Sequence, residues 1–204
     1  MAKKNSSDFQ IEKANGELLI TTSSAQKTTN FQAVDNYITG SIFSSTASVT
    51  VANTLTETSI VGTGVGSVIL PANFLIAGKT IKFKMFGTIA SILTPTARIK
   101  IKIGAVVVID TTALALLAIT GTNIFETQAM ITCRTTGASG TVFGQGLVFY
   151  YTSSTGLSGL ATPNTTTSTI DTTASQTLDV TFTWGTASAS NTITCTNTLI
   201  EVTI

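Results

Sequence analysis

Histidine is absent from this chain of 204 residues, and only 10% of the residues are charged. Without histidine, the chain lacks the usual general base, the usual activator of a serine or cysteine nucleophile and the commonest metal ligand. Carboxylates are sparse after residue 45, and none pairs with another at short spacing. We therefore expect no enzyme, cofactor site or metal site. A glycan hydrolase using Asp171 or Asp179 is the remaining enzymatic alternative, because carboxylates distant in sequence can meet in a fold.

Cysteine is nearly absent as well. Cys133 and Cys195 lie far apart in the sequence, and neither belongs to a Cys-x-x-Cys motif. We expect two small buried residues within strands. A disulfide between them is the alternative, which would require close Cα atoms and an oxidising compartment.

Long apolar segments are also missing. The best candidate, residues 105–119, is interrupted by Asp110, Thr111 and Thr112, so it falls short of the roughly 18 apolar residues of a membrane span. The basic start of the chain is followed by polar residues 5–8 rather than by the apolar core of a signal peptide. These features predict a soluble protein that is made in the cytoplasm and does not enter a membrane.

Threonine supplies the polar surface that charge does not. It makes up about a fifth of the chain, whose net charge is +1. Threonine is β-branched and favours strands, and its hydroxyl keeps an exposed face polar. A protein with few surface charges tends to associate. We therefore expect a subunit of an assembly, with a secreted domain kept soluble by threonine and serine as the alternative.

Strand signals dominate the chain from residue 47 onward. The candidate strands 79–91 and 97–110 contain the segments 81–86 (IKFKMF) and 98–103 (RIKIKI), which place apolar residues at every second position, as in half-buried strands. Further candidate strands are residues 47–52, 57–61, 67–70, 125–134, 141–152, 169–173, 177–184 and 192–204. Residues 112–120 fit a strand or a short helix equally well. The pattern predicts an all-β fold, an antiparallel jelly-roll-like β-sandwich of about eight strands over residues 46–204.

Residues 1–45 differ from the rest because they hold over a third of the charges. They read as an extended arm with one short strand at 17–22. The arm is either a disordered terminus or a segment that orders on a partner subunit. Its apolar residues are candidate inter-subunit contacts, together with leucines from the apolar stretch 113–119: Ile11, Leu18, Leu19, Ile20, Leu114, Leu116 and Leu117.

Basic residues alternate with apolar ones in two predicted strands. They are Lys82, Lys84, Arg98, Lys100 and Lys102. If the two strands are neighbours, these side chains form one basic face. This face is either solvated, with lysines that guard an edge strand, or a docking surface for an acidic protein or an anionic glycan. Nucleic acid is disfavoured, since the net charge is low and aromatic residues do not interleave with the basic ones.

Three glycine-containing segments are better explained by backbone geometry than by ligand binding. Residues 62–66 (GTGVG) lack the spacing of a phosphate loop, so we interpret them as a turn between strands. Gly104 marks a tight turn or bulge. Residues 143–146 (FGQG) indicate a bulge or a close backbone approach.

Several segments together resemble the jelly-roll structural proteins of tailed-bacteriophage virions. They are Glu57–Asp110, Phe125–Tyr151, the stretch IDTTASQTLDV at 170–180 and WGTA at 184–187. The resemblance covers residues 47–204. It implies a homotrimer on the phage particle, and no catalytic residues carry over from it.

Our leading hypothesis is a trimeric capsid decoration (cement) protein of the virion. It would bind itself and the major capsid protein or other virion proteins, but neither nucleic acid nor membrane. The alternative is a receptor- or glycan-binding module of a tail or head fibre.

Overall fold

The computed structural model describes residues 10–14, 17–21, 40–61, 68–162 and 164–203, and no helix occurs among them. The chain divides into two compact units, Met1–Tyr37 and Ile38–Ile204. In the first unit, β1 (Gln10–Ala14) and β2 (Glu17–Thr21) form an antiparallel hairpin. The strand expected at 17–22 therefore corresponds to β2. The turn expected at 62–66 lies outside the described residues, as do the side chains of Ile11, Leu18, Leu19 and Ile20.

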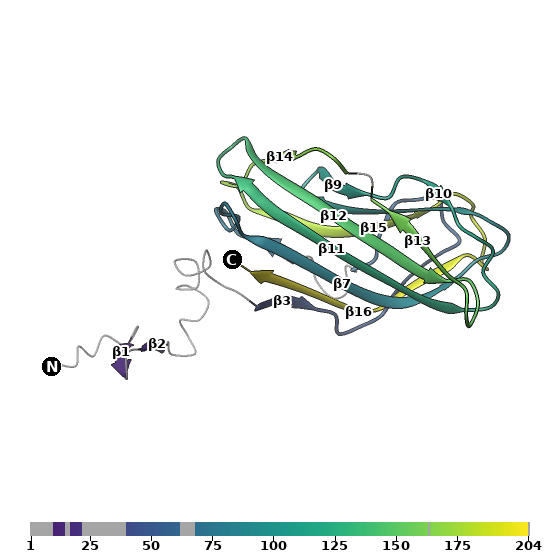
Figure 1. The fold of residues 1–204 in the computed structure, drawn as a ribbon, viewed down its shortest axis with the longest axis horizontal. Helices are drawn as coiled ribbons and strands as arrows, with labels where there is room; N and C mark the ends of the chain where they lie inside the picture. Colours follow the sequence, from purple (N-terminus) through teal and green to yellow (C-terminus); the bar gives the residue numbers. More distant parts are fainter. Residues whose placement is uncertain (1–9, 15–16, 22–39, 62–67, 163, 204) are drawn as a thin grey trace. The chain divides into compact units, whose positions relative to one another are not determined.

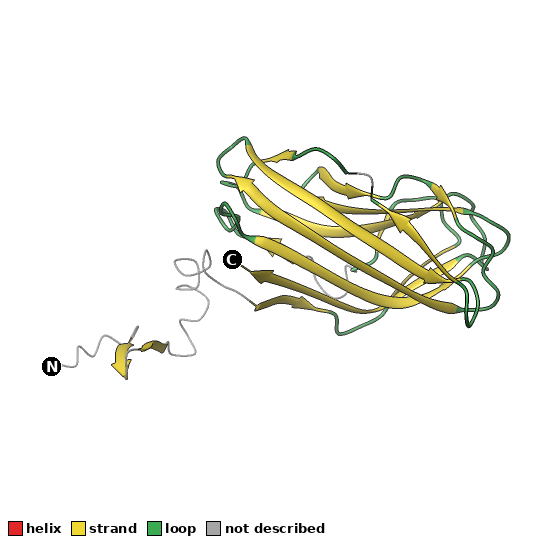
Figure 2. Cartoon of the chain, in the orientation of Figure 1, coloured by secondary structure: helices red, strands yellow, loops and turns green. Residues whose placement is uncertain are grey.

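The second unit is a sandwich of two antiparallel sheets, which confirms the all-β fold (Figures 1 and 2). We call the eight-stranded sheet the large sheet and the six-stranded one the small sheet. The large sheet contains β3 (Gly40–Ser44), β4 (Val49–Ala52), β7 (Thr80–Ala90), β11 (Asn123–Thr135), β12 (Gly140–Tyr151), β13 (Leu157–Ala161), β14 (Ser168–Ile170) and β16 (Thr192–Thr203). The small sheet contains β5 (Thr58–Ser59), β6 (Val68–Leu70), β8 (Thr96–Ile103), β9 (Val106–Asp110), β10 (Leu114–Ala115) and β15 (Gln176–Trp184).

Each edge of each sheet is a strand broken into two pieces. At one edge of the large sheet, β3 and β4 pair with successive parts of β16, and at the other, β14 and β13 pair with successive parts of β12. In the small sheet, β5 and β6 share one side of β15, and β9 and β10 share one side of β8. These breaks raise the number of strands above the eight that we expected. They also shorten every exposed edge, a common protection against edge-to-edge association.

The sandwich starts earlier than the sequence indicated. The arm was expected to reach residue 45, but β3 pairs with β16 from Gly40 onward. Residues 40–45 therefore belong to the sandwich. Their weak alternation hid this, because an edge strand buries little of either face.

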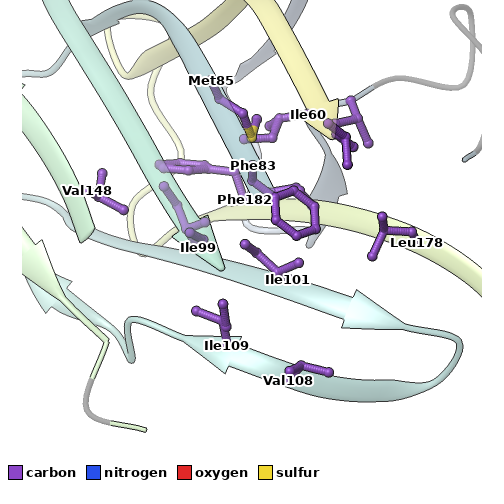
Figure 3. Packing of buried hydrophobic residues seen from close by; sticks show 14 of the residues in the cluster. Ile60, Phe83, Met85, Ile99, Ile101, Val108, Ile109, Val148, Leu178 and Phe182 are labelled. Atoms are coloured by element: carbon purple, nitrogen blue, oxygen red, sulfur yellow. The ribbon is translucent and has the colours of Figure 1, made fainter. Parts of the chain in front are cut away.

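The core lies between the two sheets (Figure 3). Strand side chains alternate between faces, so β7 buries Ile81, Phe83 and Met85 while β8 buries Ile99, Ile101 and Ile103 against them. Cys133 and Cys195 are free and buried in β11 and β16, as expected. The apolar residues 113–119 form only the two-residue β10, after which Leu116 and Ile119 insert into the core.

Threonine hydroxyls pair across neighbouring strands of the large sheet. Thr50 meets Thr194 at 2.8 Å, and Thr80 meets Thr132 at 2.9 Å. Each pair stands directly opposite in the strand register. Cross-strand hydroxyl pairs stabilise a sheet, and here they do so without charge.

Glycine allows a close backbone approach at β12, as expected from residues 143–146. A Cβ at Gly144 would lie 2.8 Å from side chains of Val108 and Ile109 in the opposite sheet. The amide of Asn164 donates to the carbonyl oxygens of both Gly144 and Val108, which ties the two sheets together at this point. Gly104, at φ +58, lies in the tight turn between β8 and β9.

Candidate functional site

The five basic residues do not form one face. Lys82 and Lys84 lie on β7 in the large sheet, whereas Arg98, Lys100 and Lys102 lie on β8 in the small sheet. Both strands direct their apolar residues inward, so their basic residues point outward from opposite sides of the sandwich. The joint basic face required neighbouring strands, and that condition is not met.

On the small sheet, every basic residue of β8 has a carboxylate partner. Arg98 donates to Asp110 at 2.9 Å through Nε and at 2.5 Å through Nη2. Glu57 accepts from Lys100 at 2.5 Å and from Lys102 at 3.2 Å. On this outer face, two carboxylates therefore hold the three cations of β8 in ion pairs.

The ion pairs also hold the carboxylates in their charged form. The hydrogen bond from Lys100 is the largest reason why the pKa of Glu57 falls to about 2, with further bonds from Thr181 and Lys102. The hydrogen bond from Arg98 lowers the pKa of Asp110 in the same way. Both carboxylates therefore stay ionised while they are paired with the cations of β8.

On the large sheet, a groove of about 710 Å³ runs over the outer face. Its lining comes mainly from β7, β11 and β12, with Ala161 from β13 and Glu201 from β16. The register places the lining side chains in rows across these strands. One row contains Lys84, Gln128, Leu147 and Ala161, and the next contains Lys82, Met130 and Gln145.

The groove is lined by the cations Lys82, Lys84 and Arg134. Within the described part of the chain, no carboxylate lies within ion-pair distance of any of them. Lys84 lies over the ring of Phe86 at 5.3 Å, and Arg134 lies over the ring of Phe143 at 5.6 Å. The charges of Lys84 and Arg134 are therefore placed against aromatic rings. Lys82 instead stands opposite Glu201 in the register of β7 and β16.

Apolar side chains form the middle of the groove. Met130 is 54% exposed and Leu147 is 49% exposed, which is unusual for residues in central strands. Phe149 is half-buried on the same face of β12. Opposite it stands Gly159, where a Cβ would lie 3.3 Å from the phenylalanine ring. The missing side chain leaves the ring accessible from the β13 side.

The expected inter-subunit leucines separate into two groups. Leu116 is 1% exposed, so its assignment as a contact residue is wrong: it fills the core beside β8. Leu114 and Leu117 are exposed and stay available for contact. The backbone N–H of Leu117 donates to the hydroxyl of the buried Tyr150, which holds this loop in place.

Sequence reasoning missed the groove residues Met130, Arg134, Phe143, Leu147 and Phe149. The signal was present as alternation within residues 125–134 and 141–152, where the outward positions hold large apolar and basic side chains. Only the pairing of β7, β11 and β12 brings these positions together.

Loops with exposed apolar residues gather at one end of the sandwich, which we call the apolar end. The loops follow β4, β7, β10 and β12, at the end opposite the one where β16 finishes (Figure 1). Leu55, Ile92, Leu93, Leu117 and Leu157 are exposed there, and Leu93 is 82% exposed. Leu93 also has φ +57, a strained backbone conformation for leucine.

The two carboxylates of the enzymatic alternative, Asp171 and Asp179, both accept hydrogen bonds. Asp171 accepts hydrogen bonds from the backbone N–H and hydroxyl of Thr173, and Asp179 accepts one from Ser59. The described residues contain no group of three acidic or cysteine side chains able to hold a metal ion, and no helix there is suited to cross a membrane.

Comparison with protein-family models, with curated proteins and with solved structures gives no match for this chain.

Proposed function

We propose that this protein is a structural subunit of a virion whose sandwich is a jelly roll. In chain order, β3/β4, β5/β6, β7 and β8 alternate between the large and small sheets. Leaving out β12 to β14, the sheet orders are β3/β4–β16–β7–β11 and β5/β6–β15–β8–β9/β10. Two four-stranded sheets connected in this way form a jelly roll. The strands β12, β13 and β14 are then an insertion that widens the large sheet and supplies one wall of the groove.

Within the virion, the function that the geometry supports best is that of a trimeric capsid decoration protein. The observation that carries it is the apolar end, where leucine and isoleucine side chains are exposed on loops that contain no charged residue apart from Glu57. Glu57 itself is engaged in the small sheet. Large exposed apolar patches mark interaction sites, and the unfavourable backbone of Leu93 is tolerated where the surroundings or a function maintain it.

The physical mechanism is mass action. A protein that binds only the assembled shell shifts the equilibrium away from the disassembled state. The first unit, with its charged residues, would contact neighbouring subunits or the capsid protein. The decisive experiment compares particles with and without this protein under heat or osmotic shock. Equal resistance of both particles would rule out the cement role.

The alternative is a receptor- or glycan-binding module of a fibre. The groove favours it, because exposed apolar and cationic side chains line a concave surface on central strands. Binding of the purified protein to host cells, together with a low copy number on the particle, would support a fibre module. A copy number in the hundreds without cell binding would support cement.

A further inference from the structure

A partner that binds in the groove can contact side chains but not free backbone hydrogen-bonding groups. It runs over β7, β11 and β12. β7 and β11 are paired on both sides. Residues 143–146 of β12 lie between the parts that pair with β13 and β14, and there the Thr162 hydroxyl and the Asn164 amide bond to the backbone of Gly146 and Gly144. An extended peptide that binds by adding a strand needs a free sheet edge, which this surface does not provide. Recognition must therefore come from the charge and shape of the lining residues.

The excess of positive charge in the groove lining favours an anionic partner. Lys82, Lys84 and Arg134 line the groove, and Glu201 is the single carboxylate among its described lining residues. On the opposite side of the molecule, each basic residue of β8 is matched by Glu57 or Asp110. The three cations of β8 thus have carboxylates within ion-pair distance. Among the described residues the three groove cations have none that close, although Glu201 stands opposite Lys82 in the strand register. A concave site lined by three cations and one carboxylate attracts negative charge.

The remaining lining residues fit a sugar ring. Phe149, Leu147 and Met130 provide apolar surface for the C–H face of a pyranose ring. Gln128 and Gln145 stand beside them, and a side-chain amide can both donate to and accept from hydroxyl groups. The groove combines apolar surface with a few polar groups, as small-ligand sites commonly do.

We propose that this groove binds an acidic polysaccharide, with uronate carboxylates at Lys82 and Lys84 and a sugar ring against Phe149. The proposal rests on the second candidate function, because it names the ligand class and the residues of that site. It does not depend on the cement role, which concerns the apolar end.

The test uses oligomers of galacturonate as the probe and the full chain as the protein. Binding is measured by titration calorimetry at low and physiological salt, with a neutral dextran oligomer as the comparison. We expect galacturonate to bind and dextran not to bind. The double variant K82Q/K84Q should weaken binding roughly tenfold, since each exposed charge contact contributes up to about 1 kcal/mol.

A matched variant separates site binding from general charge. R98Q/K102Q removes the same amount of charge from the opposite face and keeps the contact between Lys100 and Glu57. Its affinity for galacturonate should stay within twofold of the unchanged protein. F149L tests the ring contact and should weaken binding without altering its salt dependence.

Three results would overturn the proposal. They are absence of galacturonate binding at low salt, an equal loss in the two double variants, and tighter binding of polyglutamate than of galacturonate, which would indicate an acidic polypeptide as the ligand. If the protein binds galacturonate but particles with and without it resist heat equally, the cement role is refuted and the groove proposal stands.

Discussion

The indole N–H of Trp184 donates a hydrogen bond of 3.1 Å to the backbone carbonyl of Val51. Trp184 belongs to β15 in the small sheet, and Val51 belongs to β4 in the large sheet. The only tryptophan of the chain therefore joins the two layers of the sandwich by a polar contact inside the core. Its ring also meets Phe182 edge to face, with centroids 4.8 Å apart.

Replacing Trp184 by phenylalanine should destabilise the sandwich by about 2–3 kcal/mol, because the carbonyl of Val51 loses its donor and a small cavity forms. Urea denaturation followed by circular dichroism would measure this loss. F182L alters the aromatic contact but keeps the indole hydrogen bond, so it should cost about 1 kcal/mol. Equal losses in the two variants would argue against a specific role of the hydrogen bond.

The ion pairs of Glu57 should make stability sensitive to acid. Its pKa in the folded protein is about 2, below the ordinary value of 4.5. A lowered pKa contributes stability above pH 4.5 that disappears as the pH falls toward 2. E57Q should be less stable at pH 7 by about 1–2 kcal/mol, allowing for partial exposure, and should show a shallower loss in acid.

Denaturation curves at pH 7, 4 and 2.5 would check the prediction for Glu57. E126Q is the control, because Glu126 lies on the large sheet and its carboxylate bonds only to Gln128 among the described contacts. The prediction is wrong if E57Q keeps the full acid dependence of the unchanged protein.

Gly87 should tolerate no side chain. A Cβ there would lie 1.9 Å from the carbonyl oxygen of Thr194 and 2.6 Å from the ring of Phe125. Both neighbours are held in the large sheet, so G87A should cost more than about 3 kcal/mol or prevent folding. Thr88 is half-buried on the outward face of the same strand, and T88A should cost less than about 1 kcal/mol. Thermal melting of both variants tests the difference.

Both thiols should be inert in the folded protein. Burial raises the pKa of Cys133 and of Cys195, and the Cys195 sulfur also lies 3.1 Å from the hydroxyl of Thr198. Because the thiolate is the reactive form, iodoacetamide at pH 8 should modify neither residue until the chain unfolds. Mass spectrometry with and without denaturant gives the answer. Rapid modification of the native protein would contradict it.

A substitution at Leu93 can separate an effect on folding stability from an effect on capsid binding. Asparagine adopts a positive φ more readily than leucine, so L93N should keep or slightly raise the melting temperature. If the apolar end contacts the particle, the same variant should bind purified capsids several-fold more weakly. I69T is the control, since Ile69 is also apolar and exposed, at 63%, but lies on β6, away from that end. Unchanged capsid binding by L93N would refute the contact.

The alternating strands were predictable because period-two burial is local. The apolar and basic residues of β7 and β8 occupy the faces that their spacing indicated. The sheet to which each strand belongs was not predictable, because β7 pairs with β11 and β16, far away in sequence. For this reason Lys82 and Lys100 were expected on one surface but lie on opposite sides. Leu116 was misjudged for a similar reason, since no local pattern places it beside β8.

The broken edges of both sheets restrict how copies of this protein can meet. A continuous edge strand would allow neighbouring molecules to pair edge to edge through backbone hydrogen bonds and form extended sheets. This risk rises with local concentration. Here each edge consists of two short strands, which limits such edge-to-edge pairing. Crowded copies are left to touch through side chains on their faces and loops, where contacts can close into rings of fixed size instead of growing without limit.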